Sequence, residues 1–123
     1  MLEIHPADAV KTAAFVQAEG QPDGTAALRM TDGDREIGYV LYRMDRDTLY
    51  MTAAKCDDPD LYEWLLRAAM NAGVNRNAIT AVCEIADWFP MVERFGFEKE
   101  GERYSVFIPA FFNRPCQGCR SSQ

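Results

Sequence analysis

The fold is decided by residues 36–73, "EIGYVLYRMDRDTLYMTAAKCDDPDLYEWLLRAAMNAG", where strand-like runs give way to a helix-like run. Residues 37–44 are apolar almost throughout, which is typical of a strand buried on both faces of a sheet. From residue 61 the apolar side chains recur at intervals of three and four, which predicts an amphipathic helix. Gly73 is expected as the C′ residue of that helix. The predicted apolar face consists of Leu61, Trp64, Leu65, Ala68, Ala69 and Ala72.

Three antiparallel strands are expected at about residues 25–31, 36–44 and 48–55. Asp32-Gly33 is a strong hairpin signal between the first two, and the chain turns again near residues 45–47. The run "AITAVCE" that follows the predicted helix reads as a short buried strand. Because a helix returns the chain to the same end of a sheet, this strand should run parallel to the third one.

The remaining elements complete a single domain. Residues 6–20 predict a short helix, "DWFPMVERFG" predicts a second core helix that begins near Asp87, and "YSVFIPAFF" predicts a final strand. The expected fold class is α/β (α+β), a three-layer domain with a mixed sheet: an antiparallel meander followed by β-α-β-α-β. We expect this domain to cover residues 1–110 and a tail to cover residues 111–123.

Composition restricts the function classes. The chain has 123 residues, 48% of them apolar, and a formal net charge of −6. An acidic chain without a basic stripe is not expected to bind nucleic acid or an anionic membrane. No signal peptide or membrane-spanning run is visible, so a cytoplasmic protein is the expectation.

The four cysteines are expected to be reduced thiols in that compartment, and Cys83 reads as a small buried apolar residue. Cys116 and Cys119 form a Cys-x-x-Cys pair, which could be half of a zinc site or a redox pair. One chain offers no second pair of ligands, so no metal site is predicted within it, although a symmetric homodimer would supply four cysteines. An inert polar tail is the favoured interpretation. His5 is the only histidine, so no Ser-His-Asp arrangement is available without it.

The segments "EIGYVLYRM", "LYMTAAKC" and "ERFGFEKEGE", taken with the order of the elements, resemble the GNAT fold of the Gcn5-related N-acetyltransferases. The resemblance covers roughly residues 25–109. It implies transfer of an acyl group from acetyl-CoA or another acyl-CoA, as co-substrate, to a small-molecule or peptide amine. No other cofactor is expected.

The resemblance also implies where such chemistry would lie. In that family the pantetheine arm lies where the fourth and fifth strands separate, and a backbone N–H polarises the thioester carbonyl. Here the implied backbone groups belong to residues 51–55, with Thr52, Ala53 and Ala54 as candidate acyl-CoA contacts. Glu84 is the best-placed carboxylate for a general base. The candidate general acid is Tyr104, with Tyr62 as a substitute.

Two positions of the family pattern lack its usual residues. Val92 stands where a Tyr often serves as general acid, and Ile85 stands where an Asn often precedes it. Neither side chain can donate or accept a proton.

The family's phosphate-binding turn would fall in residues 56–65, "CDDPDLYEWL". This stretch has no glycine and no basic residue, and it is several residues too short. Its aspartates at 57, 58 and 60 would repel a pyrophosphate and are well placed to cap the helix themselves. Two hypotheses therefore stay open: an N-acyltransferase with an atypical site, and a non-catalytic GNAT-like domain with a binding or assembly role.

Overall fold

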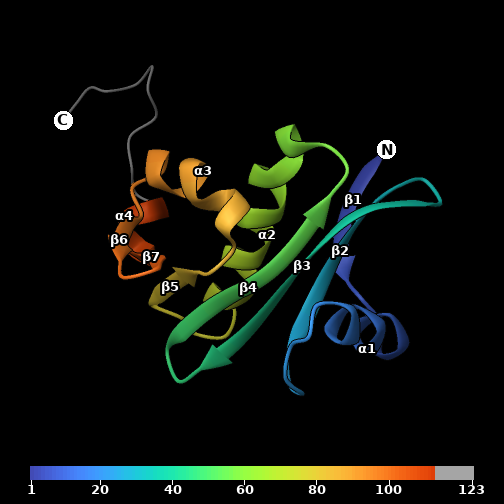
Figure 1. The fold of residues 1–123 in the computed structure, drawn as a ribbon, viewed down its shortest axis with the longest axis horizontal. Helices are drawn as coiled ribbons and strands as arrows, with labels where there is room; N and C mark the ends of the chain where they lie inside the picture. Colours follow the sequence, from blue (N-terminus) through green and yellow to red (C-terminus); the bar gives the residue numbers. More distant parts are fainter. Residues whose placement is uncertain (113–123) are drawn as a thin grey trace.

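The computed structural model describes residues 1–112, in which one sheet is flanked by helices (Figure 1). Within this part of the chain the sheet has seven strands in the order β1-β2-β3-β4-β5-β7-β6. The strands are β1 (Leu2–Pro6), β2 (Ala26–Asp32), β3 (Arg35–Asp45), β4 (Thr48–Cys56), β5 (Thr80–Cys83), β6 (Glu98–Glu100) and β7 (Arg103–Phe107). The α-helices are α1 (Ala9–Ala18), α2 (Tyr62–Val74), α3 (Phe89–Arg94) and α4 (Ile108–Phe112), with 3₁₀ turns at Pro59–Leu61 and Ala86–Trp88.

The predicted meander and parallel crossover are confirmed. β2, β3 and β4 pair antiparallel in sequence order, and β4 pairs parallel with β5 after the α2 crossover. β5 then pairs antiparallel with β7. The predicted mixed sheet and α/β class are therefore correct.

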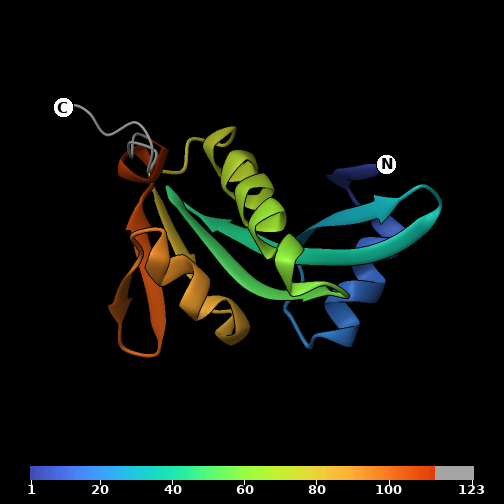
Figure 2. The ribbon, with the colours of Figure 1, turned by 90° about the horizontal axis from the view of Figure 1, so that it is seen from above.

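Two apolar clusters give the domain its three layers. The larger one joins the buried residues of α2 and α3 to one face of the sheet. The smaller one joins Phe15 of α1 to Tyr39 and Leu41 of β3 on the other face. The Phe15 and Tyr39 rings stack with centroids 4.1 Å apart. Figure 2 shows α2 and α1 on opposite sides of β2 and β3.

The predicted apolar face of α2 is rotated from the one observed. The fully buried positions are Leu65, Leu66, Ala69, Met70 and Gly73, whereas the Trp64 side chain is 61% exposed. Trp64 was expected in the core, and this expectation is wrong. Gly73 lies inside the helix rather than after it, where a Cβ would come within 3.0 Å of Leu49.

The expected final strand is also corrected. It ends at Phe107, and the chain then forms α4, in which Ile108 and Phe111 are buried. The Phe111 ring packs edge-on against Phe97 with centroids 6.1 Å apart. Cys116 and Cys119 lie outside the described residues. None of the helices in residues 1–112 has the length and apolarity needed to cross a bilayer.

Candidate active site

The centre of the candidate site is the place where β4 and β5 separate. Their parallel ladder runs from Thr48 to Met51, and its last bond is donated by the Glu84 N–H to the Met51 carbonyl at 2.9 Å. On the other side of β4, Leu41 of β3 pairs with Ala53. The residue that follows Leu41 in β3 pairs with Met51, so Thr52 has no partner residue in β3. Thr52 is therefore the extra residue of a β-bulge, a feature that bends a strand. Figure 2 shows β4 and β5 close together at one end and diverging toward the other.

The bulge leaves backbone donors of β4 facing the opening. The Asp57 N–H is donated to the Ile37 carbonyl of β3 at 2.9 Å. Because backbone groups alternate along a strand, those of Ala53 also point to β3, whereas those of Ala54 and Cys56 point to the side of β5. The β4–β5 ladder does not extend that far. The N–H groups of Ala54 and Cys56 are therefore placed to face a ligand carbonyl.

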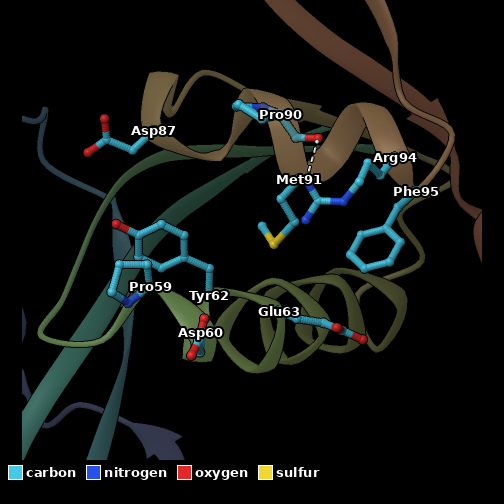
Figure 3. Close-up of a pocket in the computed structure, with 9 residues that line it drawn as sticks. All are labelled: Pro59, Asp60, Tyr62, Glu63, Asp87, Pro90, Met91, Arg94 and Phe95. Atoms are coloured by element: carbon cyan, nitrogen blue, oxygen red, sulfur yellow. Dashed lines mark hydrogen bonds between the residues drawn. The ribbon is translucent and has the colours of Figure 1, made fainter.

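A cavity of about 360 Å³ lies between the start of α2 and α3 (Figure 3). Its walls carry three carboxylates, those of Asp60, Glu63 and Asp87, and one guanidinium, that of Arg94. Arg94 donates to the Pro90 carbonyl at 3.4 Å and so stays on the α3 side. The remaining lining residues are Pro59, Tyr62, Pro90, Met91 and Phe95.

The α2 end of the cavity carries negative charge and supplies its own cap. The Asp58 carboxylate accepts the Asp60 N–H at 2.9 Å and so caps the 3₁₀ turn Pro59–Leu61 that precedes α2. The N-cap residue of α2 itself, Leu61, has no side-chain hydrogen bond, so the expected capping of the helix by its aspartates is found only at that preceding turn. Glu63 lies in the first turn of α2 and pairs with Arg67 at 2.8 Å. A helix start that binds pyrophosphate offers free N–H groups and no competing anions. These residues do not fit a pyrophosphate.

Aromatic and apolar side chains of the core lie beside the cavity. Trp88 is 1% exposed, and its ring lies 6.1 Å from that of Tyr62, which lines the cavity. Ile85 and Val92 are buried in the same cluster. The two positions where the family pattern places polar residues are therefore part of the core.

The structure places Glu84 and Tyr104 on opposite faces of the sheet. Glu84 pairs with Arg103 of β7 at 3.1 Å. Tyr104, the next residue of β7, packs on Phe89 of α3 with ring centroids 4.9 Å apart. Successive residues of a strand point to opposite faces, so Tyr104 lies on the α3 side and Glu84 on the side of α1. The two candidates flank the opening and are not in mutual contact.

The face that carries Glu84 also holds a group of cationic and aromatic side chains. The Arg43 guanidinium lies 4.3 Å from the centre of the Tyr50 ring, and the Arg103 guanidinium lies 5.6 Å from it. Such contacts fix the orientation of both side chains. Arg103 thereby holds the Glu84 carboxylate beside the end of β5.

Cys83 lies at the end of β5 but is not placed to act as a nucleophile. Its side chain is fully buried, and burial raises the pKa of the thiol to about 12. A nucleophilic cysteine needs the opposite shift. The thiol donates instead to the Ile85 carbonyl at 3.7 Å.

Comparison with known proteins bears on the fold. Neither a family model nor a curated protein matches the sequence. Solved structures do match. The ribosomal-protein-S18-alanine N-acetyltransferase from Escherichia coli superposes with a TM-score of 0.64 at 14% identity, over 86% of this chain and 90% of that one.

A GNAT-family protein from Desulfovibrio desulfuricans gives a TM-score of 0.67 at 13% identity, over 88% and 99% of the two chains. The spermidine/spermine N-acetyltransferase from Vibrio cholerae gives 0.69 at 10% identity, over 91% and 95%. The chain has the GNAT fold. At these identities the likeness establishes the GNAT architecture, including the order of strands around the opening, and not the reaction.

Sequence reasoning missed the α3 wall of the cavity. Asp87 was expected only as a helix cap, and Arg94 was not singled out. No local pattern separates these residues from an ordinary solvated helix face. Their part in the cavity follows only from the packing of α3 beside the start of α2.

Proposed function

We propose that the chain is an N-acyltransferase that takes the acyl group of an acyl-CoA thioester at the opening between β4 and β5 and transfers it to an amine. The observation that carries the proposal is the bulge at Thr52, which turns the N–H groups of Ala54 and Cys56 toward the opening. Fixed donors of this kind stabilise the negative charge that develops on a carbonyl oxygen under attack. Solved GNAT-fold proteins named as N-acetyltransferases share the architecture.

Glu84 and Tyr104 each carry out one of the two proton transfers, on opposite faces of the sheet. Glu84 accepts a proton from the amine on the α1 side, where Arg103 holds its carboxylate in place. Tyr104, on the α3 side, donates a proton to the departing sulfur. This arrangement lets donor and acceptor approach from opposite faces of the sheet. Thr52 and Ala53 contribute through the shape of the bulge and Ala54 through its N–H group.

The donor is recognised through its acyl and pantetheine parts. The carboxylates of Asp58 and Asp60 make the α2 start negatively charged. The nucleotide end of acyl-CoA therefore contributes little binding free energy there. The acceptor class is an amine. The named activities of the structural neighbours suggest two kinds to try first, a polyamine and a peptide that begins with alanine.

A non-catalytic binding or assembly domain is the second candidate. The burial of Trp88 and Val92 in the core and the acidic α2 start favour it. Under this hypothesis the bulge is a retained structural feature and no thioester binds.

A thermal-shift titration with acetyl-CoA, CoA and ADP separates the two candidates. A ligand at about 100 times its dissociation constant adds roughly 2.7 kcal/mol to the free energy of unfolding. The proposal expects stabilisation by acetyl-CoA and CoA and none by ADP. Absence of any shift at millimolar acetyl-CoA would support the non-catalytic candidate and overturn the first.

The roles of the side chains are tested by acyl transfer to spermidine and to an alanine-terminated peptide. Glu84→Gln and Tyr104→Phe are expected to lower kcat by about 10²-fold or more. Glu98→Gln, an exposed carboxylate of β6, is the matched control and should leave the rate unchanged. Equal rates in all three variants would contradict the assigned roles.

A further inference from the structure

The two edges of the sheet differ in how they are protected. β6 forms one edge with the short, fully exposed sequence Glu98–Glu100, and charged side chains on a three-residue strand discourage pairing with another chain. β1 forms the other edge, and within the described residues nothing pairs with its outer side. It carries Leu2 and Ile4 on one face and Glu3 and His5 on the other.

The outward backbone groups of β1 can be assigned from its register. Ala7, which follows the strand, donates its N–H to the Ala27 carbonyl of β2 at 3.1 Å, and His5 lies opposite Arg29. Odd-numbered residues therefore bond to β2, and the backbone groups of Leu2, Ile4 and Pro6 point outward. Leu2 and Ile4 each present an N–H and a carbonyl, whereas Pro6 presents only a carbonyl.

An apolar groove follows the same edge. Leu2, Ile4, Met30 and Trp64 surround a cavity of about 300 Å³ between β1 and α2. Trp64 is 61% exposed and Leu2 is 45% exposed. A large aromatic side chain beside a free strand edge is a feature of interaction surfaces rather than of protected edges.

We propose that a second copy of this chain occupies the edge, with β1 pairing antiparallel to β1 of the partner about a two-fold axis at Ile4. In this register Ile4 exchanges two hydrogen bonds with its equivalent. Each Leu2 N–H then meets the carbonyl of the partner's Pro6. The two sheets become one continuous sheet, and the Leu2, Ile4 and Trp64 side chains of both copies lie on the same face of it.

Side-chain complementarity selects this register. With the axis at Ile4, each Glu3 lies directly opposite the partner's His5. An axis at Glu3 would set two carboxylates against each other, and an axis at His5 would pair the two imidazoles. An imidazole N–H can donate a hydrogen bond to a carboxylate across a strand pair, whereas two carboxylates that face each other destabilise the pair. On β2, Arg29 lies opposite His5 and Thr31 lies opposite Glu3. Glu36 forms one ion pair with Arg29 and another with Lys11 of α1.

The arrangement leaves the candidate active site free. β1 is separated from β4 by β2 and β3, so a partner at this edge does not cover the opening (Figure 1). The interface is therefore independent of the proposed acyl transfer and can be tested without it.

Sedimentation of the full chain across roughly 1 μM to 1 mM is the test, with dissociation constants compared between variants. The wild type is expected to form a dimer within this range. His5→Glu sets each Glu3 against a partner carboxylate and should weaken the dimer about tenfold. The double variant Glu3→Lys/His5→Glu sets a lysine opposite each introduced carboxylate and should recover at least the wild-type affinity.

Two further variants test the strand pairing and the groove. Ile4→Pro removes an N–H that β2 does not use, so the domain should fold and the dimer should weaken about tenfold or more. Trp64→Lys should weaken the dimer, whereas Val74→Lys, an exposed apolar position on the same helix, should not. A chain that stays monomeric throughout, or a dimer unaffected by His5→Glu and Ile4→Pro, overturns the proposal.

Discussion

The opening between β4 and β5 and the start of α2 are neighbouring parts of one site, yet they are built in different ways. The opening is fixed by a β-bulge and by buried side chains such as Trp88. The start of α2 is an exposed turn held by Asp58 and flanked by further carboxylates. A bulge belongs to the pairing of three strands and cannot change without disturbing the sheet, whereas a surface turn can change alone. The contrast indicates that packing constrains the strand geometry more strongly than it constrains the surface turn before α2.

The largest difference between the two parts should appear in stability. Trp88→Ala removes a fully buried ring and should lower the free energy of unfolding by about 3–5 kcal/mol. Asp60→Ala, at the exposed α2 start, should change it by less than about 0.5 kcal/mol. Chemical denaturation of both variants checks this. A cost below about 1 kcal/mol for Trp88→Ala would mean that the opening is loosely packed.

A second difference concerns the thiols on either side of the opening. Burial raises the pKa of Cys83 to about 12, whereas Cys56 is partly exposed. At pH 8 a thiol reagent should modify Cys56 rapidly and Cys83 about 10³-fold more slowly, measured with Cys116→Ser and Cys119→Ser in place. Because the folded-state pKa of Cys83 lies above the unfolded one, its contribution to stability is complete below pH 9. That contribution is lost as the pH rises toward 12. Comparable rates for both thiols would contradict the packing of β5.

Removing charge at the α2 start should raise affinity for the donor. Asp57→Asn and Asp60→Asn together remove two carboxylates near the expected pyrophosphate position and leave the Asp58 cap in place. At about 1 kcal/mol for each repulsion, the affinity for acetyl-CoA should rise about tenfold or more. Calorimetric titration measures the change, with Asp45→Asn and Asp47→Asn at a distant turn as the control. An unchanged affinity would show that these charges do not face the donor.

The smallest expected effect concerns the cap itself. Asp58→Ala leaves the Asp60 N–H without its carboxylate partner and should lower the free energy of unfolding by about 1 kcal/mol. Asp58→Asn can accept the same hydrogen bond and should be close to neutral. Thermal unfolding of the two variants separates the hydrogen bond from the charge, and equal losses in both would assign the effect to charge.

The central strands could be predicted from the sequence because their signals are local. The apolar run of β3 and the Asp32-Gly33 signal, which lies at the observed two-residue turn of Gly33 and Asp34, specify a meander without reference to the rest of the chain. The edge strands β1 and β6 were missed because the apolar/polar alternation of "LEIH" is only four residues long and is ended by Pro6, and because "EKE" has no apolar residue. They are strands only because a neighbour pairs with them.

The candidate site was predicted in part, and the parts that failed are nonlocal. The acidic α2 start could be read directly from "CDDPD", but the Asp58 carboxylate caps the 3₁₀ turn before α2 rather than α2 itself. The bulge at Thr52 depends on register with β3, and the cavity that includes Arg94 depends on where α3 packs. The sequence placed Trp64 in the core because residue spacing alone locates the apolar face of a helix only to within one position. A shift of one position is enough to move a side chain from the core to solvent.

The central claim is that the opening can hold an acyl thioester whereas the α2 start does not bind pyrophosphate. Comparing acetyl-CoA with acetyl-pantetheine, which lacks the nucleotide and its phosphates, tests this most directly. The account predicts that acetyl-pantetheine binds at least as tightly as acetyl-CoA, because the carboxylates of the α2 start repel the nucleotide phosphates, and that ADP does not compete. Binding of acetyl-CoA about 100-fold tighter than acetyl-pantetheine, with ADP as a competitor, would contradict it.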